Sequence, residues 1–188
     1  MSSNQSLSTT LVIGGSGMLA KASLWLAGQG KTIVLGRSRR KLDALAELAP
    51  AGAIVPLSLD YTSTDTLARH LASASDMHGP ITRTVAWIHN DGLDAHHVIA
   101  EAMDEDADYF HLLGSAATDP SAGVEDRFAH LRAQFGSRYR EIVLGFQLEG
   151  NHSRWLTHEE IATGVIDAIS NPRPRCIIGV VEPWSRRP

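Results

Sequence analysis

Six residues near the start of the chain have the types and spacing that hold a phosphate group. Glycines at two of the positions leave backbone N–H groups without an obstructing Cβ, and the positive end of a following helix attracts an anion. The apolar run Leu11-Val12-Ile13 precedes them, and the small Ala20 would let a helix pack closely on a sheet. This spacing between a strand and a helix predicts a turn that binds the pyrophosphate of a dinucleotide. Its residues are Gly14, Gly15, Ser16, Gly17, Met18 and Leu19.

A basic segment follows the second apolar run, Thr32 to Gly36, and begins with Arg37 and Ser38. An NAD site usually has an acidic residue here, which would repel the 2′-phosphate of NADP. A guanidinium instead matches phosphate oxygens in a fork geometry, and a serine hydroxyl adds a further bond. The sequence therefore predicts NADP(H) rather than NAD(H). One or two of the next basic residues are expected to be solvated residues of a helix: Arg39, Arg40 and Lys41.

Two further turns follow the third and fourth apolar runs. Asp60 and Tyr61 come after the third run, where the carboxylate can accept a hydrogen bond from an adenine amino group or simply lead the next helix. His89 and Asn90 end the fourth run, and their turn is expected beside the ribose of the nicotinamide half. These four residues complete the predicted cofactor site.

The elements that would position these residues alternate between strand and helix patterns. Several strand patterns are apolar on consecutive residues, as in strands buried on both faces of a parallel sheet. We predict an α/β fold with a single doubly wound parallel sheet of about seven strands, helices on both faces, and ligands at the carboxyl ends of the strands. The expected strands are Thr10 to Gly14, Thr32 to Gly36, Ala53 to Leu57, Arg83 to His89, Tyr109 to Gly114, Glu141 to Phe146 and Arg175 to Val180. The expected helices are Gly17 to Ala27, Arg39 to Leu48, Ser63 to Ser75, Asp94 to Asp104, Val124 to Phe135 and His158 to Ile169.

Two local signals refine this pattern. The acidic stretch from Asp104 to Asp108 falls at the expected end of a helix, where the helix dipole disfavours negative charge, so we expect a solvated loop. Thr157 and Glu160 have the spacing of a capping box, which predicts a defined start for the last helix.

Length and composition favour one domain, because 188 residues with 43% hydrophobic content suffice for a three-layer core. We expect a disordered polar tail over residues 1–9 and a single domain over 10–188. A net charge of −4 provides no basic field for nucleic acid or an anionic membrane. The lone Cys176 and the polar start without a secretory pattern predict a cytoplasmic protein.

Together these motifs resemble the short-chain dehydrogenase/reductase superfamily, whose fold is the Rossmann fold. The glycine turn, the basic residue after the second strand, Asp60 and the turn with Asn90 match the family in order and spacing. Ser115 matches the serine that usually follows the fifth strand. The resemblance implies a nicotinamide cofactor, a small-molecule substrate, oxidoreductase activity and a homo-oligomer.

The family's Tyr-x-x-x-Lys dyad, which supplies the proton, has no counterpart in this sequence. The only lysines are Lys21, Lys31 and Lys41, and no tyrosine has a lysine four residues later. The expected helix Val124 to Phe135 contains no tyrosine, and Tyr139 would lie at the start of the sixth strand, remote from the ligand crevice. The family's acid chemistry therefore cannot be transferred to this chain.

Other side chains at the strand ends are candidates for that chemistry. His89 is the best-placed acid or base, because an imidazole titrates near neutrality, and Ser115 can hydrogen-bond a substrate oxygen. Both residues would equally suit a structural turn. The segment from Gln147 to Trp155 is interpreted either as a substrate loop or as a surface loop in which Trp155 anchors the last helix.

We expect no metal site, because His96 and His97 point different ways on a helix and His97 with Glu101 makes only two ligands. The leading hypothesis is an NADP(H)-dependent oxidoreductase that acts on a small carbonyl or imine, with His89 and Ser115 as catalytic residues. A non-catalytic NADP(H)-binding redox sensor or regulatory protein is the rival hypothesis. Epimerase or lyase chemistry with a tightly held cofactor is a third.

Overall fold

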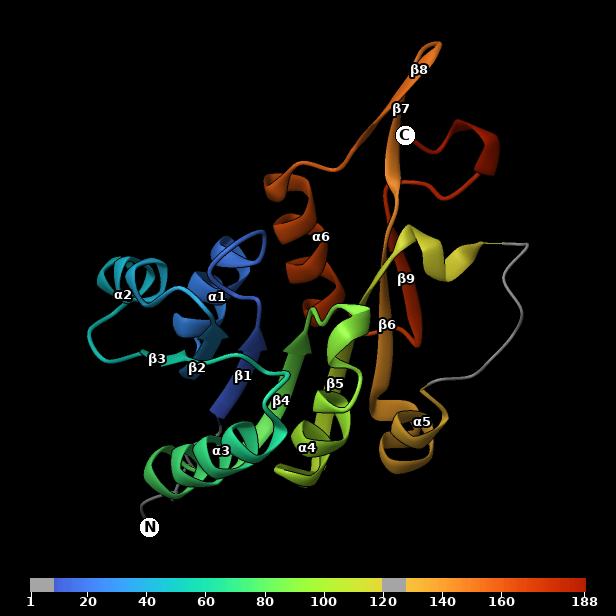
Figure 1. Ribbon diagram of the computed structural model, residues 1–188. Helices are drawn as coiled ribbons and strands as arrows, with labels where there is room; N and C mark the ends of the chain where they lie inside the picture. The colour runs from blue at the N-terminus through green and yellow to red at the C-terminus, as the bar shows by residue number, and fades with distance from the viewer. Residues whose placement is uncertain (1–8, 120–127) are drawn as a thin grey trace.

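The computed structural model describes residues 9–119 and 128–188, and its centre is a seven-stranded parallel sheet in the order β3-β2-β1-β4-β5-β6-β9 (Figure 1). This architecture confirms the predicted doubly wound sheet. The strands are β1 (Thr9–Ile13), β2 (Lys31–Gly36), β3 (Ile54–Ser58), β4 (Ile81–Ala86), β5 (Met103–Gly114), β6 (Tyr139–Leu144) and β9 (Arg175–Ile178).

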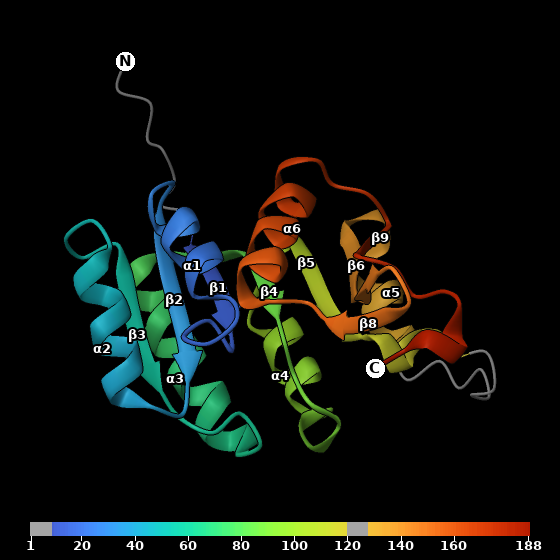
Figure 2. The same ribbon diagram turned by 90° about the horizontal axis from the view of Figure 1, so that it is seen from above.

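Helices cover both faces of the sheet. One face carries α3, α4 and α5, and the other carries α1, α2 and α6 (Figure 2). These layers follow from the right-handed crossovers that join parallel strands. The bounds are α1 (Ala20–Ala27), α2 (Arg39–Leu48), α3 (Thr64–His78), α4 (Ala95–Glu101), α5 (Ala129–Phe135) and α6 (His158–Ser170).

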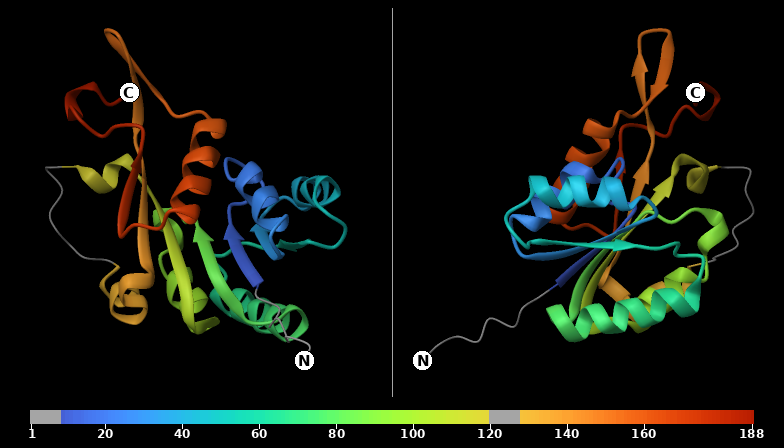
Figure 3. Two further views of the ribbon diagram at one scale, coloured as in Figure 1. Left: turned by 180° about the vertical axis from the view of Figure 1, so that it is seen from behind. Right: turned by 60° about the vertical axis from the view of Figure 1, so that its left-hand side comes forward.

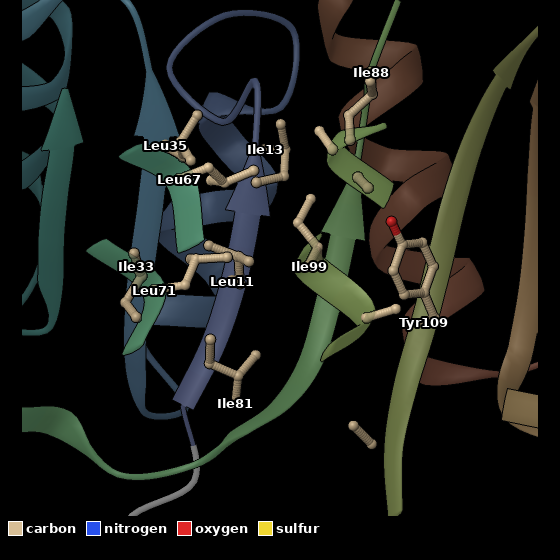
Figure 4. Close-up of a cluster of buried hydrophobic side chains, with 14 of the residues drawn as sticks. Leu11, Ile13, Ile33, Leu35, Leu67, Leu71, Ile81, Ile88, Ile99 and Tyr109 are labelled. Atoms are coloured by element: carbon tan, nitrogen blue, oxygen red, sulfur yellow. The ribbon is translucent and has the colours of Figure 1, made fainter. Parts of the chain in front are cut away.

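The largest part of the core lies between the sheet and helices α3 and α4 (Figure 4). Leu11 and Ile33 project from neighbouring strands toward Leu71 of α3, while Ile99 of α4 packs near Tyr109 of β5. All five side chains are buried. Burial on both sides of the sheet explains why the strand sequences are apolar on consecutive residues.

The strand order reverses between β1 and β4. Val12 of β1 pairs in register with Val34 of β2 on one side and Val85 of β4 on the other. The chain runs from this point toward β3 in one direction and toward β9 in the other. A ligand crevice is expected at the carboxyl ends of strands at such a point.

The expectation of a solvated loop over Asp104 to Asp108 is wrong. Strand β5 begins at Met103, which pairs with Ile81, and the ladder then shifts so that Asp108 pairs with Arg83. Neighbouring arginines compensate for the acidic side chains, because Arg138 lies 3.3 Å from Asp106 and Arg140 bonds Asp108. Helix α4 correspondingly ends at Glu101, before the acidic stretch.

The sixth strand also ends earlier than predicted, at Leu144, and a β-hairpin replaces the expected loop. Gly145 separates β6 from β7 (Phe146–Glu149), which pairs antiparallel with β8 (His152–Trp155). A Cβ at Gly145 would lie 2.2 Å from the carbonyl oxygen of Val180, so only glycine fits there. A Gly-Asn turn with Gly150 at φ +57° joins the two strands. The hairpin projects beyond the carboxyl ends of the sheet strands (Figure 3).

Three further expectations concern the ends of elements. Helix α1 begins at Ala20 instead of Gly17, and four short 3₁₀ turns occupy 90–92, 115–118, 136–138 and 184–186. The predicted tail over residues 1–9 lies outside the described residues except for Thr9, which begins β1. The predicted start of the fifth helix, residues 124–127, also lies outside them. Among residues 9–119 and 128–188, no helix is long and apolar enough to cross a bilayer.

Candidate functional site

The glycine-rich segment forms a turn that links β1 to α1. Gly14 has φ +77°, and its N–H donates to the carbonyl oxygen of Leu35 at 3.0 Å. The N–H groups of Ser16, Met18 and Leu19 make no hydrogen bond to any residue that the structure describes. An anion is the natural partner for backbone donors at the start of a helix.

Two glycines of this turn differ in what a side chain at their position would contact. A Cβ at Gly15 would lie 2.6 Å from both the Ser23 Oγ and a methyl of Val34, so this glycine is required by packing. A Cβ at Gly17 would meet nothing closer than 3.8 Å, which leaves this position open toward a ligand. The side chain of Leu19 is fully buried and Gly15 has no side chain, so both residues can offer only backbone groups to a ligand.

A cleft of about 250 Å³ extends from this turn to the carboxyl ends of β2 and β3. It brings together residues of the glycine turn, of the basic segment and of the segments that follow the third and fourth strands. Lys41 also lines the cleft, although the sequence did not separate it from the solvated residues of its helix. The lining residues are Gly14, Ser16, Gly17, Leu35, Gly36, Arg37, Ser38, Lys41, Leu59, Tyr61, Trp87 and His89.

The basic residues of the cleft differ in their partners. Arg39 is exposed and pairs with Asp43 one turn along α2, so it is a surface residue. Arg37 and Lys41 form no ion pair with a carboxylate in residues 9–119 or 128–188. The Ser38 Oγ caps α2 by accepting a hydrogen bond from the N–H of Lys41 at 3.4 Å. Arg37 and Lys41 therefore place two positive groups in the cleft that no carboxylate of the described residues pairs with.

Asp60 does not line the cleft. Its Oδ1 accepts hydrogen bonds from the N–H of Thr62 at 3.0 Å and from the Thr62 hydroxyl at 2.8 Å. These bonds, with a smaller contribution from the Arg37 charge, hold the pKa of Asp60 below its usual value. The geometry matches the helix-leading alternative for Asp60, whereas Tyr61 does face the cleft.

His89 stands between two cavities. Besides the cleft, it lines a second cavity of about 230 Å³ together with Asn90 and His111. Its imidazole lies edge-on to the Trp87 indole, with 5.2 Å between ring centroids. The His89 side chain makes no hydrogen bond to a described residue, so a role as a hydrogen-bonded structural histidine is not supported.

Ser115 opens a 3₁₀ turn after β5 and is 3% exposed. Its Oγ accepts a hydrogen bond from Nε of Arg187 at 2.7 Å, across 72 residues of sequence. Both residues line a third cavity of about 280 Å³, and Trp87 forms a wall of all three. The third cavity is mostly apolar and is lined by Met18, Trp87, Gly114, Ser115, Ala116, Leu144, Gly145, Trp155, Leu156, Ile161 and Arg187.

The hairpin that follows β6 contributes Trp155 to this cavity, but its charged residues have structural partners. Arg154 forms a two-pronged pair with Glu160, at 2.9 and 3.0 Å, and also bonds Glu149 at 2.6 Å. These bonds and the predicted capping box with Thr157, which is present, lower the pKa of Glu160 to about 2. The Arg154 pair attaches the hairpin to the start of α6.

Sequence reasoning missed Trp87 and Arg187 as site residues. Trp87 directly follows β4, so its place beside the strand ends was a usable signal. No sequence signal identified Arg187, because its approach to Ser115 depends on the path of the chain after β9. Tyr139, as expected, begins β6; its hydroxyl bonds the Nδ1 of buried His111 at 2.8 Å.

Known structures share this fold over most of their length. A short-chain dehydrogenase/reductase from Serratia marcescens superposes with a TM-score of 0.67 at 16% identity, over 93% of this chain and 99% of that chain. A protein from Brucella melitensis, titled short-chain dehydrogenase/reductase and glucose/ribitol dehydrogenase, gives 0.65 at 18% identity, over 90% and 93%. The chain has the short-chain dehydrogenase/reductase fold. A short-chain dehydrogenase from Streptomyces avermitilis, at 0.65 and 15% identity over 94% of this chain and 89% of that chain, has the same fold.

Sequence comparison gives no closer relationship, since neither a protein-family model nor a curated protein matches the chain. Among the described residues, no group of three or more His, Cys, Asp or Glu side chains is placed to hold a metal ion. In this structure the glycine turn, the cleft and the Ser115 cavity lie at the carboxyl ends of the strands.

Proposed function

We propose that the protein is an NADP(H)-dependent oxidoreductase of the short-chain dehydrogenase/reductase type that acts on a small carbonyl or imine compound. The observation that carries this proposal is the cleft between the glycine turn and the basic segment. It combines the N–H group of Ser16, which makes no hydrogen bond to a described residue, with Arg37 and Lys41, which form no ion pair with a described carboxylate.

The residues present fit a dinucleotide with an additional phosphate. The glycine turn would receive the pyrophosphate, because Gly14 adopts the positive φ of the turn and Gly17 leaves room for close approach of an anion. Arg37 would bind the 2′-phosphate by its guanidinium fork, with Lys41 as a second positive charge. Ser38 already caps α2 and adds its hydroxyl at the rim. Tyr61 and Asn90 would bound the adenosine and ribose regions.

The chain's own residues must orient the substrate and move a proton, while a bound NADPH supplies the hydride. Ser115 accepts a hydrogen bond from Arg187, so its own hydroxyl hydrogen is free to bind the oxygen of a substrate carbonyl. His89, whose imidazole has no described hydrogen-bond partner, would deliver the proton to that oxygen through water in the crevice. The mostly apolar walls of the Ser115 cavity would contact the apolar part of a substrate.

Fluorescence titration with NADPH and NADH tests the cofactor assignment. We expect NADPH to bind at least about tenfold more tightly, because only NADPH carries the phosphate that pairs with Arg37. Arg37→Ala should lose most of this preference while NADH binding stays unchanged. Arg40→Ala is the matched control, since Arg40 is an exposed residue of α2, three positions after Arg37, that does not line the cleft.

Absorbance measurements of NADPH oxidation with a panel of aldehydes, ketones and imines then test the reaction. Turnover that requires both NADPH and a carbonyl or imine compound would support the proposal. Tight NADPH binding without turnover on any compound would instead favour the non-catalytic redox sensor. Failure to bind either dinucleotide would overturn both.

A further inference from the structure

Arg187 occupies an unusual place beside Ser115. Its guanidinium carbon lies 5.0 Å from the ring centroid of Trp155 and 5.2 Å from that of Trp184, so aromatic rings flank the cation. The Nε donates to the Ser115 Oγ at 2.7 Å, and Arg187 lines the apolar cavity. Such cation–π contacts favour one orientation of the guanidinium.

The segment that carries Arg187 is held firmly against the hairpin. Phe146 and Val180 exchange two backbone hydrogen bonds, each of 2.9 Å, directly after β9. Further along, Nη2 of Arg186 donates to the carbonyl oxygens of Gly150 at 2.7 Å and His152 at 3.2 Å. These backbone and side-chain hydrogen bonds attach the C-terminal segment to the hairpin, beside which it lies (Figure 1).

The charge of Arg187 has no counter-ion among residues 9–119 and 128–188, where the only hydrogen bond of the guanidinium goes to Ser115. A guanidinium has five N–H donors, so four on the two terminal nitrogens are available to a ligand. By contrast, six other arginines pair with carboxylates: Arg39, Arg132, Arg138, Arg140, Arg154 and Arg175.

An anion with two oxygens is the ligand that complements such a group. The terminal nitrogens of a guanidinium match a carboxylate in two parallel hydrogen bonds. Nε of Arg187 is already bonded to Ser115, so a carboxylate on the terminal nitrogens would lie next to the serine hydroxyl. That hydroxyl can donate to a second oxygen of the same molecule, one that is close to the carboxylate.

We propose that Arg187 binds a substrate carboxylate and that the substrate is a small 2-oxo acid with an apolar remainder. The carboxylate would bond the terminal nitrogens of Arg187, and the adjacent carbonyl oxygen would accept the hydrogen of Ser115. Met18, Leu144, Leu156 and Ile161 provide the apolar lining for the remainder. This assignment of substrate class rests on the proposed oxidoreductase function, although the binding of the acid by Arg187 does not require turnover.

Calorimetric titration tests the binding directly, both with and without saturating NADP⁺. The probes are straight and branched 2-oxo acids of three to six carbons, with 4-methyl-2-oxopentanoate compared against the neutral 4-methyl-2-pentanone. We expect the acid to bind about tenfold or more tightly than the ketone. Arg187→Met should remove this difference while leaving ketone binding unchanged, and Arg187→Lys should restore part of it.

Arg173→Met is the matched control, because Arg173 is exposed in the turn after α6 and makes no ion pair with a described residue. It removes the same charge and should leave binding of the acid unchanged. NADPH affinity of Arg187→Met, measured by fluorescence, should also stay unchanged.

Three results would overturn the inference: no 2-oxo acid binds the unaltered protein, the acid binds no tighter than the ketone, or Arg187→Met weakens NADPH binding instead of acid binding. The proposed function would fail separately, by absence of NADPH binding or of NADPH oxidation. In that case, calorimetric titration of the acid without cofactor would still test whether Arg187 binds the carboxylate.

Discussion

The backbone N–H of His89 donates a hydrogen bond of 3.3 Å to the phenol oxygen of Tyr61, 28 residues earlier in the chain. This bond ties the turn after β3 to the turn after β4. Gly92 makes the approach possible, since a Cβ there would lie 2.2 Å from the Tyr61 ring. The position of His89 therefore depends on a residue that follows β3 and lines the same cleft.

Tyr61→Phe should reduce kcat/KM for NADPH about threefold to tenfold, because it removes the acceptor that fixes the backbone of His89. The ring and its packing remain, so the melting temperature should change little. Steady-state kinetics and a thermal melt of the same sample measure both effects. Unchanged kinetics would show that this bond does not position the histidine.

Substitutions at two glycines of the turn should affect different properties: one the free energy of unfolding, the other dinucleotide binding. Gly15→Ala is expected to lower the free energy of unfolding by about 1–3 kcal/mol, because its Cβ would overlap Ser23 and Val34. Gly17→Ala should keep the stability within about 1 kcal/mol yet weaken dinucleotide binding, since its methyl group points into open space. Urea denaturation and cofactor titration of both variants provide the comparison; equal effects of the two substitutions would contradict the distinction.

His89→Gln and Ser115→Ala should each lower turnover about a hundredfold, because they remove the proposed proton donor and the donor to the substrate oxygen. Dinucleotide affinity should be nearly unchanged in Ser115→Ala, because Ser115 does not line the cleft. His158→Gln, at an exposed position at the start of α6, is the control. Turnover at the normal rate in both site variants would remove these residues from the mechanism.

The buried histidines should make stability fall in acid. Burial lowers the pKa of His96 from 6.5 to about 4 and holds that of His111 well below its usual value. The unfolded chain then binds protons below about pH 6.5 that the folded chain does not, so the free energy of unfolding decreases as pH falls from about 6.5 toward 4. The loss linked to His96 alone is at most about 3 kcal/mol.

Urea denaturation at several pH values measures this dependence. His96→Gln should flatten the curve between pH 6.5 and 4, whereas His70→Gln, at an exposed position on α3, should not. A flat curve for the unaltered protein in this range would contradict the neutral, buried state of these side chains.

Local sequence signals predicted the sheet and most of the cleft. Runs such as Leu11 to Ile13 are apolar on consecutive residues because β1 is buried on both faces, and that pattern is readable without a structure. The glycine turn and Arg37 directly follow strands, so the topology brought them together. Lys41 was harder to assign, because its place in the cleft depends on the rotation of α2.

Errors arose where distant residues decide the structure. The acidic start of β5 is a strand because Arg138 and Arg140 compensate for its charges, and both come from more than 30 residues later. The buried pair of His96 and Tyr109, whose Nδ1 and hydroxyl oxygen lie 2.7 Å apart, joins a helix to a strand and leaves no periodic signal. The Ser115–Arg187 bond likewise depends on the hairpin and on the path after β9.

The two ends of the crevice come from separate parts of the gene product. Most of the cleft is built by residues 14–61. One wall of the Ser115 cavity instead comes from residues 144–187, which include the hairpin, the start of α6 and the Arg187 segment. Exchange of the later segment between related chains would alter which compound is accepted without redesigning dinucleotide recognition. Diversification of chemistry on this scaffold can thus proceed as a modular change at one end of the polypeptide.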